Sequence, residues 1–199
     1  MKIFDISQEV FDCAVFPGDP KPVRNRMMLI KKGDVCNLTG IEMCAHNGTH
    51  VDAPYHFIDE GRSIGEVPLE HYVGYASVFH HEGDVTESDA VGIINNAKSL
   101  GDDCEKRILI GGNATVTEES AKVFAREGVK LVGNESQTVG PENAPKNVHM
   151  ILLGAEVTLL EGIRLSDVPD GKYLLNCAPL NLGGADGAPC RAILLSMEE

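Results

Sequence analysis

Short runs of β-favouring apolar residues recur along almost the whole chain and constrain its fold more than any other feature. Glycines, 21 in all, are spread between these runs and mark turns. Runs of this length bounded by turn residues are typical of β-strands. We therefore predict strands over Lys2–Ile6, Ala76–His80, Arg107–Gly111, Val129–Gly133, His149–Gly154, Tyr173–Asn176 and Ala192–Leu195.

Two segments have helical periodicity instead. Glu87–Leu100 carries apolar residues three and four positions apart, and Gly101 follows it. Thr117–Glu127 is clearer, because Thr117 is a suitable N-cap, acidic residues follow in the first turn and Gly128 stands at its end. Strands outnumber helices, and their order predicts an α/β domain with a mixed or barrel-like sheet.

The composition narrows the class of protein. A chain of 199 residues, 43% apolar and 24% charged, with no repeat or linker, is expected to form one soluble domain over residues 1–199. No apolar run approaches the roughly 18 residues that span a bilayer, and the N-terminus lacks a secretory pattern, so we expect a cytoplasmic protein. The net charge of −13 disfavours nucleic acid and anionic membranes as partners, because both require Lys or Arg at phosphate. Small molecules or other proteins are the expected partners.

The six cysteines contain no C-x-x-C pair. In a chain without a secretory pattern this spacing favours reduced thiols over disulfides. We expect all of them to act as small buried hydrophobic side chains. They are Cys13, Cys36, Cys44, Cys104, Cys177 and Cys190.

The segment Ala45–Phe57 concentrates three histidines and an aspartate. On a strand or extended loop, His46, Gly48, His50 and Asp52 project to one side. Imidazole and carboxylate groups are ligands for Zn²⁺, and also for Mn²⁺ or Fe²⁺. Gly48 has no side chain, so a metal or substrate can approach the backbone there. The sequence therefore predicts a metal site, with Zn²⁺ preferred and Mn²⁺ as the alternative.

Two further metal-type side chains lie near the C-terminal end. His149 begins one predicted strand, and Glu161 follows a second apolar run, Val157–Leu160. We expect the two to project from neighbouring strands of a hairpin that turns at 154–156. By contrast, His71, His80 and His81 are expected to be ordinary surface or strand-end residues.

These motifs resemble the cyclase family of metal-dependent hydrolases, which includes bacterial kynurenine formamidase and isatin hydrolase. His46–Phe57 contains the family's H-x-G-T-H-x-D-x-P-x-H signature without a substitution. Phe16–Pro20, the spacing from His149 to Glu161, and the stretch from Gly183 to Ala192 also match. The resemblance extends over essentially the whole chain.

The resemblance implies a swivelling β/β/α fold with a central barrel-like sheet and a dimer or tetramer. It also implies one or two metal ions, the first bound by His46, His50 and Asp52, with Asp52 bridging to a second completed by His149 and Glu161. His56 is carried over as the general acid/base.

The expected reaction is attack of metal-bound hydroxide on an amide, formamide or lactone-like carbonyl. The leading substrate is an arylformamide such as N-formylkynurenine, and Phe16 stands where formamidases place an aromatic residue against the substrate. Three differences weaken an aryl pocket: 133–140 departs from the family's G-I-D-x-x-S-V-D, the preceding loop Gly111–Val116 is short beside that of formamidases, and the chain has no tryptophan. An isatin-hydrolase-like cyclic amide or lactone hydrolase therefore remains an alternative, as does a non-catalytic metal- or ligand-binding protein of the same fold.

Overall fold

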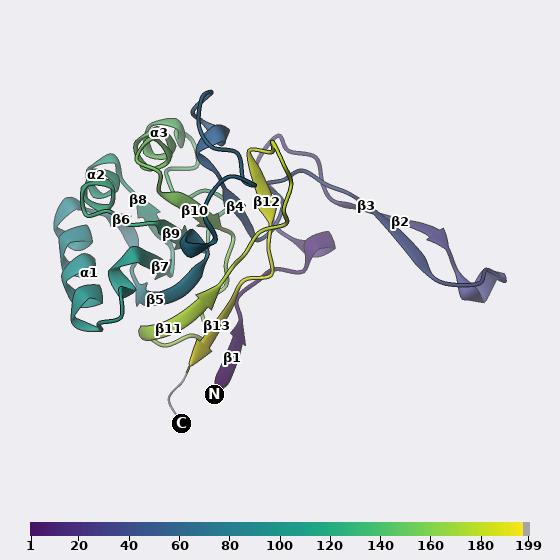
Figure 1. Ribbon diagram of the computed structural model, residues 1–199, viewed down its shortest axis with the longest axis horizontal. Coiled ribbons are helices and arrows are strands. Elements are labelled where there is room, and N and C mark those ends of the chain that lie inside the picture. The colour runs from purple at the N-terminus through teal and green to yellow at the C-terminus, as the bar shows by residue number, and fades with distance from the viewer. Residues whose placement is uncertain (197–199) are drawn as a thin grey trace.

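A curled, mixed β-sheet of nine strands organises residues 1–196, the part of the chain that this computed structural model describes (Figure 1). The neighbours β5, β7, β9 and β10 run parallel, and the outer pairs are antiparallel. In spatial order the strands are β1 (Lys2–Asp5), β13 (Ile193–Ser196), β11 (Gly171–Asn176), β5 (Val73–His80), β7 (Arg107–Gly111), β9 (Leu131–Asn134), β10 (Thr158–Glu161), β4 (His50–Asp52) and β12 (Gly187–Pro189). The predicted mixed, barrel-like sheet is confirmed.

Three α-helices cover one face of the sheet: α1 (Glu87–Ser99), α2 (Glu118–Arg126) and α3 (Lys146–Gly154) (Figure 1). The two predicted helices are confirmed as α1 and α2. Each begins with a capping box, in which the side chain of Thr86 or Thr117 accepts a hydrogen bond from the third helical backbone N–H. The reciprocal bonds from Asp89 and Ser120 complete the boxes, which explains why both helices begin where they do.

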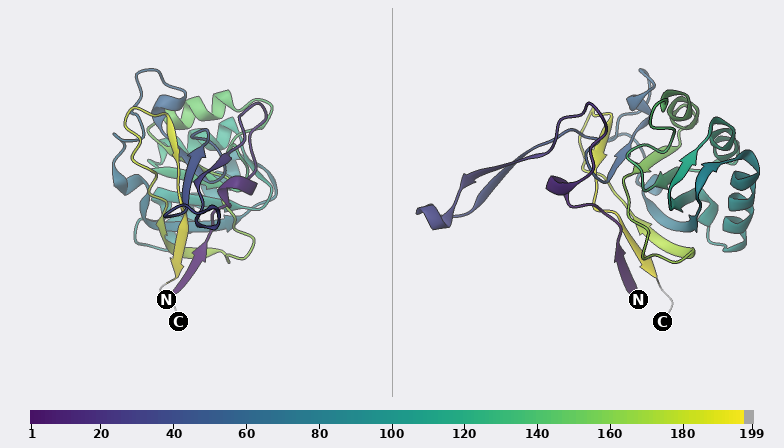
Figure 2. Two further views of the ribbon diagram at one scale, coloured as in Figure 1. Left: turned by 90° about the vertical axis from the view of Figure 1, so that its right-hand side faces the viewer. Right: turned by 180° about the vertical axis from the view of Figure 1, so that it is seen from behind.

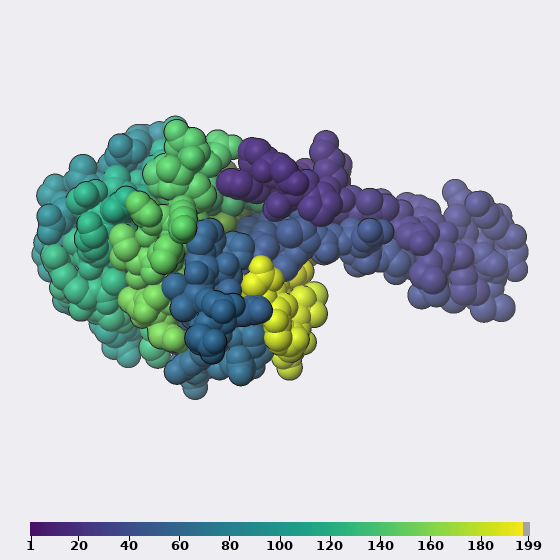
Figure 3. All heavy atoms as spheres, turned by 90° about the horizontal axis from the view of Figure 1, so that it is seen from above, coloured from purple at the N-terminus to yellow at the C-terminus, as the bar shows by residue number. Residues whose placement is uncertain are grey.

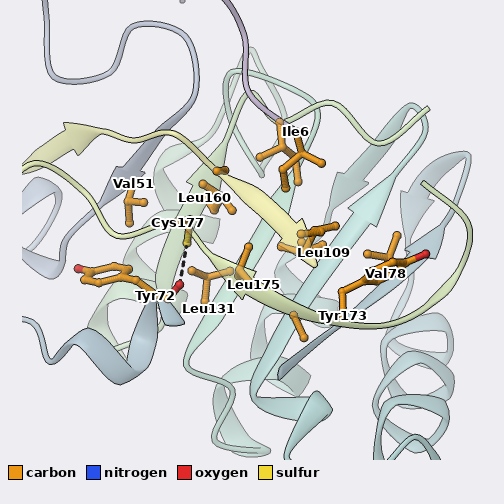
Figure 4. Close-up of a cluster of buried hydrophobic side chains, with 14 of the residues drawn as sticks. Ile6, Val51, Tyr72, Val78, Leu109, Leu131, Leu160, Tyr173, Leu175 and Cys177 are labelled. Atoms are coloured by element: carbon orange, nitrogen blue, oxygen red, sulfur yellow. Dashed lines mark hydrogen bonds between the residues drawn. The ribbon is translucent and has the colours of Figure 1, made fainter. Parts of the chain in front are cut away.

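Apolar side chains fill both faces of the sheet. On the helical face, residues such as Ile94, Phe124 and Leu152 pack against the sheet and are at most 2% exposed. On the opposite face the curled sheet and its connections enclose a second core, which includes Val51 and Leu160 (Figure 4). Strand β4, which carries His50 and Asp52, is thereby anchored in this core through the fully buried Val51.

Six of the seven predicted strands are confirmed, with ends shifted by at most a few residues. The strand predicted over His149–Gly154 is wrong, because this segment lies in helix α3. Its buried residues Val148, His149, Leu152 and Leu153 recur four positions apart, as on one face of a helix. A short apolar run does not distinguish a buried strand from a buried helix, which explains the error.

Two smaller two-stranded sheets complete the fold of residues 1–196. Strands β6 (Gly83–Val85) and β8 (Ala114–Val116) form a parallel pair beside the helices. Strands β2 (Val23–Met28) and β3 (Leu38–Glu42) form an antiparallel hairpin that projects far from the body (Figures 1 and 2). We call residues 21–42 the arm, and no strand or helix is predicted there from the sequence.

All six cysteines are free. Cys104 and Cys177 are buried as predicted, but Cys36 is exposed on the arm and the remaining three are only partly buried. The prediction that all six are buried is therefore wrong. Cys36 is exposed because the arm does not pack against a hydrophobic core. Within residues 1–196, no helix has the length and apolar character needed to cross a membrane.

Candidate metal centre

Strand β4 and the turn before it place the first three predicted ligands side by side. His50 and Asp52 project to the same side of β4, and both are buried. Gly48 has a φ of +67°, a conformation that favours glycine, and turns the chain so that His46 folds back onto Asp52. The Nδ1 atom of His46 lies 2.8 Å from Oδ1 of Asp52.

Strand β10 and helix α3 supply the other two predicted ligands. The antiparallel register of β10 with β4 places Glu161 directly opposite His50. His149 reaches the same place from α3, the helix that precedes β10. The predicted hairpin between His149 and Glu161 is therefore wrong, although the two side chains do meet: Nε2 of His149 lies 3.2 Å from Oε1 of Glu161.

The two buried carboxylates connect the histidines into one cluster. Oδ1 of Asp52 lies 3.3 Å from Nε2 of His50, and Oδ2 lies 3.6 Å from Nε2 of His149. Glu161 makes the corresponding approaches through its two oxygens, with Oε2 at 3.4 Å from Nε2 of His50. His46, His50 and Asp52 form one group able to hold a metal ion, and Asp52, His149 and Glu161 form a second. Asp52 is common to both groups.

Backbone carbonyls orient two of the histidine rings. Nδ1 of His50 lies 3.0 Å from the carbonyl oxygen of Gly48, and Nδ1 of His149 lies 2.9 Å from that of Pro145. A carbonyl oxygen can only accept, so each Nδ1 donates and each Nε2 keeps its lone pair when the ring is neutral. This arrangement, in which the second nitrogen fixes the ring, is the usual one for metal-binding histidines.

Unpartnered atoms at the centre of the cluster fit a metal ion. Nε2 of His50 and Oδ2 of Asp52 are fully buried, and neither has a hydrogen-bond partner within residues 1–196. Leaving such groups unpaired costs about 1–3 kcal/mol each, and more when they are charged. A divalent cation among nitrogen and carboxylate donors would satisfy both atoms.

Without a metal ion, the charges of the cluster are balanced by its own side chains. Burial alone would lower the pKa of His46, but the hydrogen bond and attraction of Asp52 outweigh it and raise this pKa to about 9. Burial likewise opposes ionisation of Asp52, yet the adjacent His46 and His50 hold its pKa well below the usual value. Without a metal, protonated histidines therefore neutralise the buried carboxylates.

Asp186 joins the site from the loop before β12, and the sequence analysis did not assign it a role. Its Oδ2 lies 2.8 Å from Nε2 of His46 and 3.1 Å from Nδ1 of His56. The rings of His46 and His56 are stacked, with centroids 4.0 Å apart. Asp186 lies in the C-terminal motif Gly183–Ala192, and that position was the signal that could have identified it.

The protonation state of His56 differs from that of His46, on which its ring stacks. It ends a short 3-10 turn, Pro54–His56, directly after β4. Burial, the main cause, lowers the pKa of His56 below its usual value despite the attraction of Asp52. At neutral pH His56 is therefore uncharged and able to accept a proton.

A cavity of about 250 Å³ opens onto the cluster. Phe16, Phe57 and Pro145 provide its apolar wall, and Phe16 therefore lies beside the metal-type residues, where the sequence analysis expected it to meet substrate. Gln137 and Thr138 add polar groups. Cavities that hold drug-sized ligands are commonly 300 to 1,000 Å³, so this one suits a small compound.

The segment 133–140, which departs from the family pattern, supports the site. The backbone N–H of Val139 donates to Oε1 of Glu161 at 2.8 Å, and Glu135 accepts hydrogen bonds from the backbone N–H groups of Gly112 and Leu165. His71, His80 and His81 belong to none of the possible metal-binding groups in residues 1–196. Each instead contacts a backbone carbonyl oxygen.

Comparisons with known proteins agree on one family. The sequence model of the family described as "Putative cyclase" matches residues 4–141. A kynurenine formamidase from Erythrobacter litoralis (strain HTCC2594) is 30% identical over all of this chain and 95% of its own length.

Solved structures share the fold. A structure described as a potential metal-dependent hydrolase with cyclase activity superposes with a TM-score of 0.80 at 26% identity, over all of this chain and 99% of its own. Isatin hydrolase A from Labrenzia aggregata has a TM-score of 0.83 at 20% identity, covering 99% of this chain and 94% of its own.

Proposed function

The chain belongs to the cyclase family, and on that premise we propose that it is a metal-dependent hydrolase that cleaves the C–N bond of a small amide or formamide. One observation carries the proposal: five metal-type side chains from β4, the turn before it, α3 and β10 converge where, within residues 1–196, buried Nε2 of His50 and Oδ2 of Asp52 have no hydrogen-bond partner. The same cluster faces a cavity that can admit a small substrate.

Zn²⁺ is the proposed metal and Mn²⁺ the alternative, because the donors are imidazole nitrogens and carboxylate oxygens. His46, His50 and Asp52 would hold one ion, and Asp52, His149 and Glu161 a second where two are bound. Such a metal supplies Lewis acidity, which lowers the pKa of water and polarises a carbonyl group.

His56 is the proposed general acid/base. Its Nδ1 can donate to Asp186, which leaves Nε2 as the basic nitrogen of the uncharged ring. In the proposed reaction Nε2 accepts a proton as water adds to the carbonyl carbon, and returns it to the nitrogen as the C–N bond breaks. Asp186 holds the ring in the orientation that this transfer needs.

N-formylkynurenine is the leading substrate, with water as co-reactant and formate and kynurenine as products. The full-length similarity to a kynurenine formamidase supports this choice, as do Phe16 and Phe57 in the cavity wall. The small cavity and the fold shared with isatin hydrolase A favour a second candidate, a compact cyclic amide such as isatin. A lactone would react in the corresponding way, with its ring C–O bond breaking and the proton passing from His56 to the leaving oxygen.

The test combines metal analysis with turnover. Purified protein is analysed by plasma mass spectrometry, and hydrolysis of N-formylkynurenine and of isatin is followed for the native chain, His50→Ala and His56→Ala. We expect near-stoichiometric Zn or Mn that His50→Ala loses and His56→Ala retains, with turnover abolished in both. His81→Ala, a histidine outside the cluster, is the matched control and should keep metal and turnover.

Other outcomes discriminate between the alternatives. Turnover of isatin alone would assign the cyclic-amide activity in place of the formamidase activity. Bound metal without turnover of any amide, formamide or lactone would leave a non-catalytic metal- or ligand-binding protein. If no metal binds under any loading condition, the proposed chemistry is wrong.

A further inference from the structure

A third group of side chains able to hold a metal ion lies at the outer edge of the cluster. It consists of His46, His56 and Asp186, whose donor atoms lie within 4.8 Å of one another. Oδ2 of Asp186 stands between the two rings, 2.8 Å from Nε2 of His46 and 3.1 Å from Nδ1 of His56. We call these three residues the outer group.

The donors of the outer group suit a zinc ion in type and in spacing. Two imidazole nitrogens and one carboxylate oxygen are donors that Zn²⁺ prefers. Ligands that lie about 2.0–2.2 Å from a tetrahedral zinc ion are roughly 3.3–3.6 Å from one another. The present separations are slightly shorter, so a small opening of the group is enough to admit an ion.

Exposure to solvent decreases from the outer group toward the interior. The side chain of Asp186 is 41% exposed, that of His56 26% and that of His46 14%. The other four side chains of the candidate metal centre are at most 4% exposed. An ion that arrives from solvent therefore meets donors of the outer group before those of the interior.

Two surface loops hold the outer group in place. His56 comes from the segment after β4, and Asp186 comes from the loop before β12. The backbone N–H groups of Ala53 and Ile64 donate to the carbonyl oxygens of Asp186 and Ala185, at 2.9 and 2.8 Å. Figure 3 shows the two segments side by side on the molecular surface, the first in blue and the second in yellow. The outer group is therefore formed before any ion binds.

His46 belongs to both the outer group and the candidate metal centre, through opposite ring nitrogens. Its Nε2 faces Asp186, and its Nδ1 lies 2.8 Å from Oδ1 of Asp52. A neutral imidazole has a single lone pair, so His46 can bind an ion through only one nitrogen at a time. With Nε2 on an outer ion, Nδ1–H donates to Asp52, and with Nδ1 on an inner ion, Nε2–H donates to Asp186. When an ion moves inward, one proton leaves Nδ1 and one is taken up at Nε2, with no net change.

We propose that His46, His56 and Asp186 form an entry site, at which a divalent ion such as Zn²⁺ binds from solvent before it passes to the candidate metal centre. The inference rests on the proposed metal binding but on no particular substrate. His46 stays beside the ion throughout, because its two nitrogens face the two sites. Transfer of the ion releases His56 and Asp186, which are then free for their proposed roles in turnover.

Uptake kinetics test the entry site without substrate. Metal-free protein is mixed rapidly with Co²⁺, a coloured ion that binds the same donors as Zn²⁺, and absorbance follows its uptake. We expect the native uptake rate to level off as the Co²⁺ concentration rises, because the entry site becomes filled and transfer inward then limits the rate. Direct binding to the candidate metal centre would instead give a rate that rises in proportion to the concentration.

Two substitutions remove ligands of the entry site alone. His56→Ala and Asp186→Asn should each slow uptake about tenfold or more at low Co²⁺ concentration, because the rate there depends on the affinity of the entry site. Metal content at equilibrium, measured by plasma mass spectrometry, should stay native. His56→Ala is the sharper test, because a shorter side chain widens the opening and would speed uptake if His56 only lined a passage. It also removes no negative charge, so a loss of electrostatic attraction would not explain slower uptake.

The matched control is Asp167→Asn, which removes an exposed carboxylate outside the metal-binding groups of residues 1–196 and should keep the native rate. Repeating the series in 1 M salt screens long-range attraction and should preserve the effect of Asp186→Asn. A native rate proportional to concentration, or uptake at the native rate or faster in both variants, would overturn the entry site and leave the metal centre in place. A native chain that binds neither Co²⁺ nor Zn²⁺ at equilibrium would refute the metal centre and the entry site together.

Discussion

Metal-free protein should lose stability as the pH rises from 6.5 to about 9, because of His46. This side chain is only 14% exposed, and its contacts with Asp52 and Asp186 favour the protonated ring. The interval between its usual pKa of 6.5 and the folded value of about 9 corresponds to about 3 kcal/mol in the free energy of unfolding.

Stability falls with rising pH because the unfolded chain releases the His46 proton at a lower pH than the folded chain does. Below pH 6.5 His46 is protonated in both the folded and the unfolded chain, so its full stabilisation is present. Between pH 6.5 and about 9 the unfolded chain has lost this proton while the folded chain retains it, and stability falls. Above pH 9 the contribution of His46 is gone.

Urea unfolding followed by circular dichroism suits this measurement, because the chain has no tryptophan. Unfolding is measured at a series of pH values from 6.5 to about 9, with a chelator present to keep the protein free of metal. His46→Gln should make this loss smaller but not abolish it, because the neighbouring carboxylates, against the effect of burial, also raise the pKa values of His50 and His149. His71→Gln is the control and should keep it, because burial lowers the pKa of His71 and moves its titration below this interval. A native free energy of unfolding that stays constant or rises across the interval would refute the reasoning. Added Zn²⁺ should reverse the trend, since metals bind the deprotonated ring.

Three further substitutions have defined outcomes. Gly162→Ala should destabilise the chain by about 3 kcal/mol or more in thermal unfolding, because φ is +69° and the new Cβ would lie 2.5 Å from a backbone carbonyl oxygen. Gly92→Ala, with open space in helix α1, is its control and should stabilise by about 0.5–1 kcal/mol. Phe124→Ala should cost about 3–5 kcal/mol in urea unfolding, because this side chain is fully buried, while metal content stays native. Asp186→Asn should lower turnover about 10- to 100-fold by releasing His56, with bound metal retained; native turnover would remove Asp186 from the mechanism.

Local sequence was sufficient for the elements whose signals lie within a few residues. The capping threonines Thr86 and Thr117 mark both helix starts, and the alternation from His50 to Asp52 places two metal-type side chains on one face of a strand. These features depend on hydrogen bonds and periodicities within one turn or one strand. They could therefore be predicted without knowing what packs around them.

Helix α3 and the arm could not be predicted in the same way. The run that begins at His149 is apolar on both faces, so only its burial between the sheet and helix α2 decides that it is helical. The arm lacks a buried face, and the apolar residues of its strands do not alternate with polar ones as they do in a half-buried strand. In both cases the deciding contacts are absent from the local sequence.

By itself, the sequence determined the types of side chain in the candidate metal centre and their spacing on β4. Only the tertiary structure decided how they meet, because the β4–β10 register sets Glu161 opposite His50 and helix α3 brings in His149. It also placed Asp186 beside His56 across 130 residues of chain. Contacts of this range arise only when the sheet closes, since no local energy term relates residues so distant in sequence.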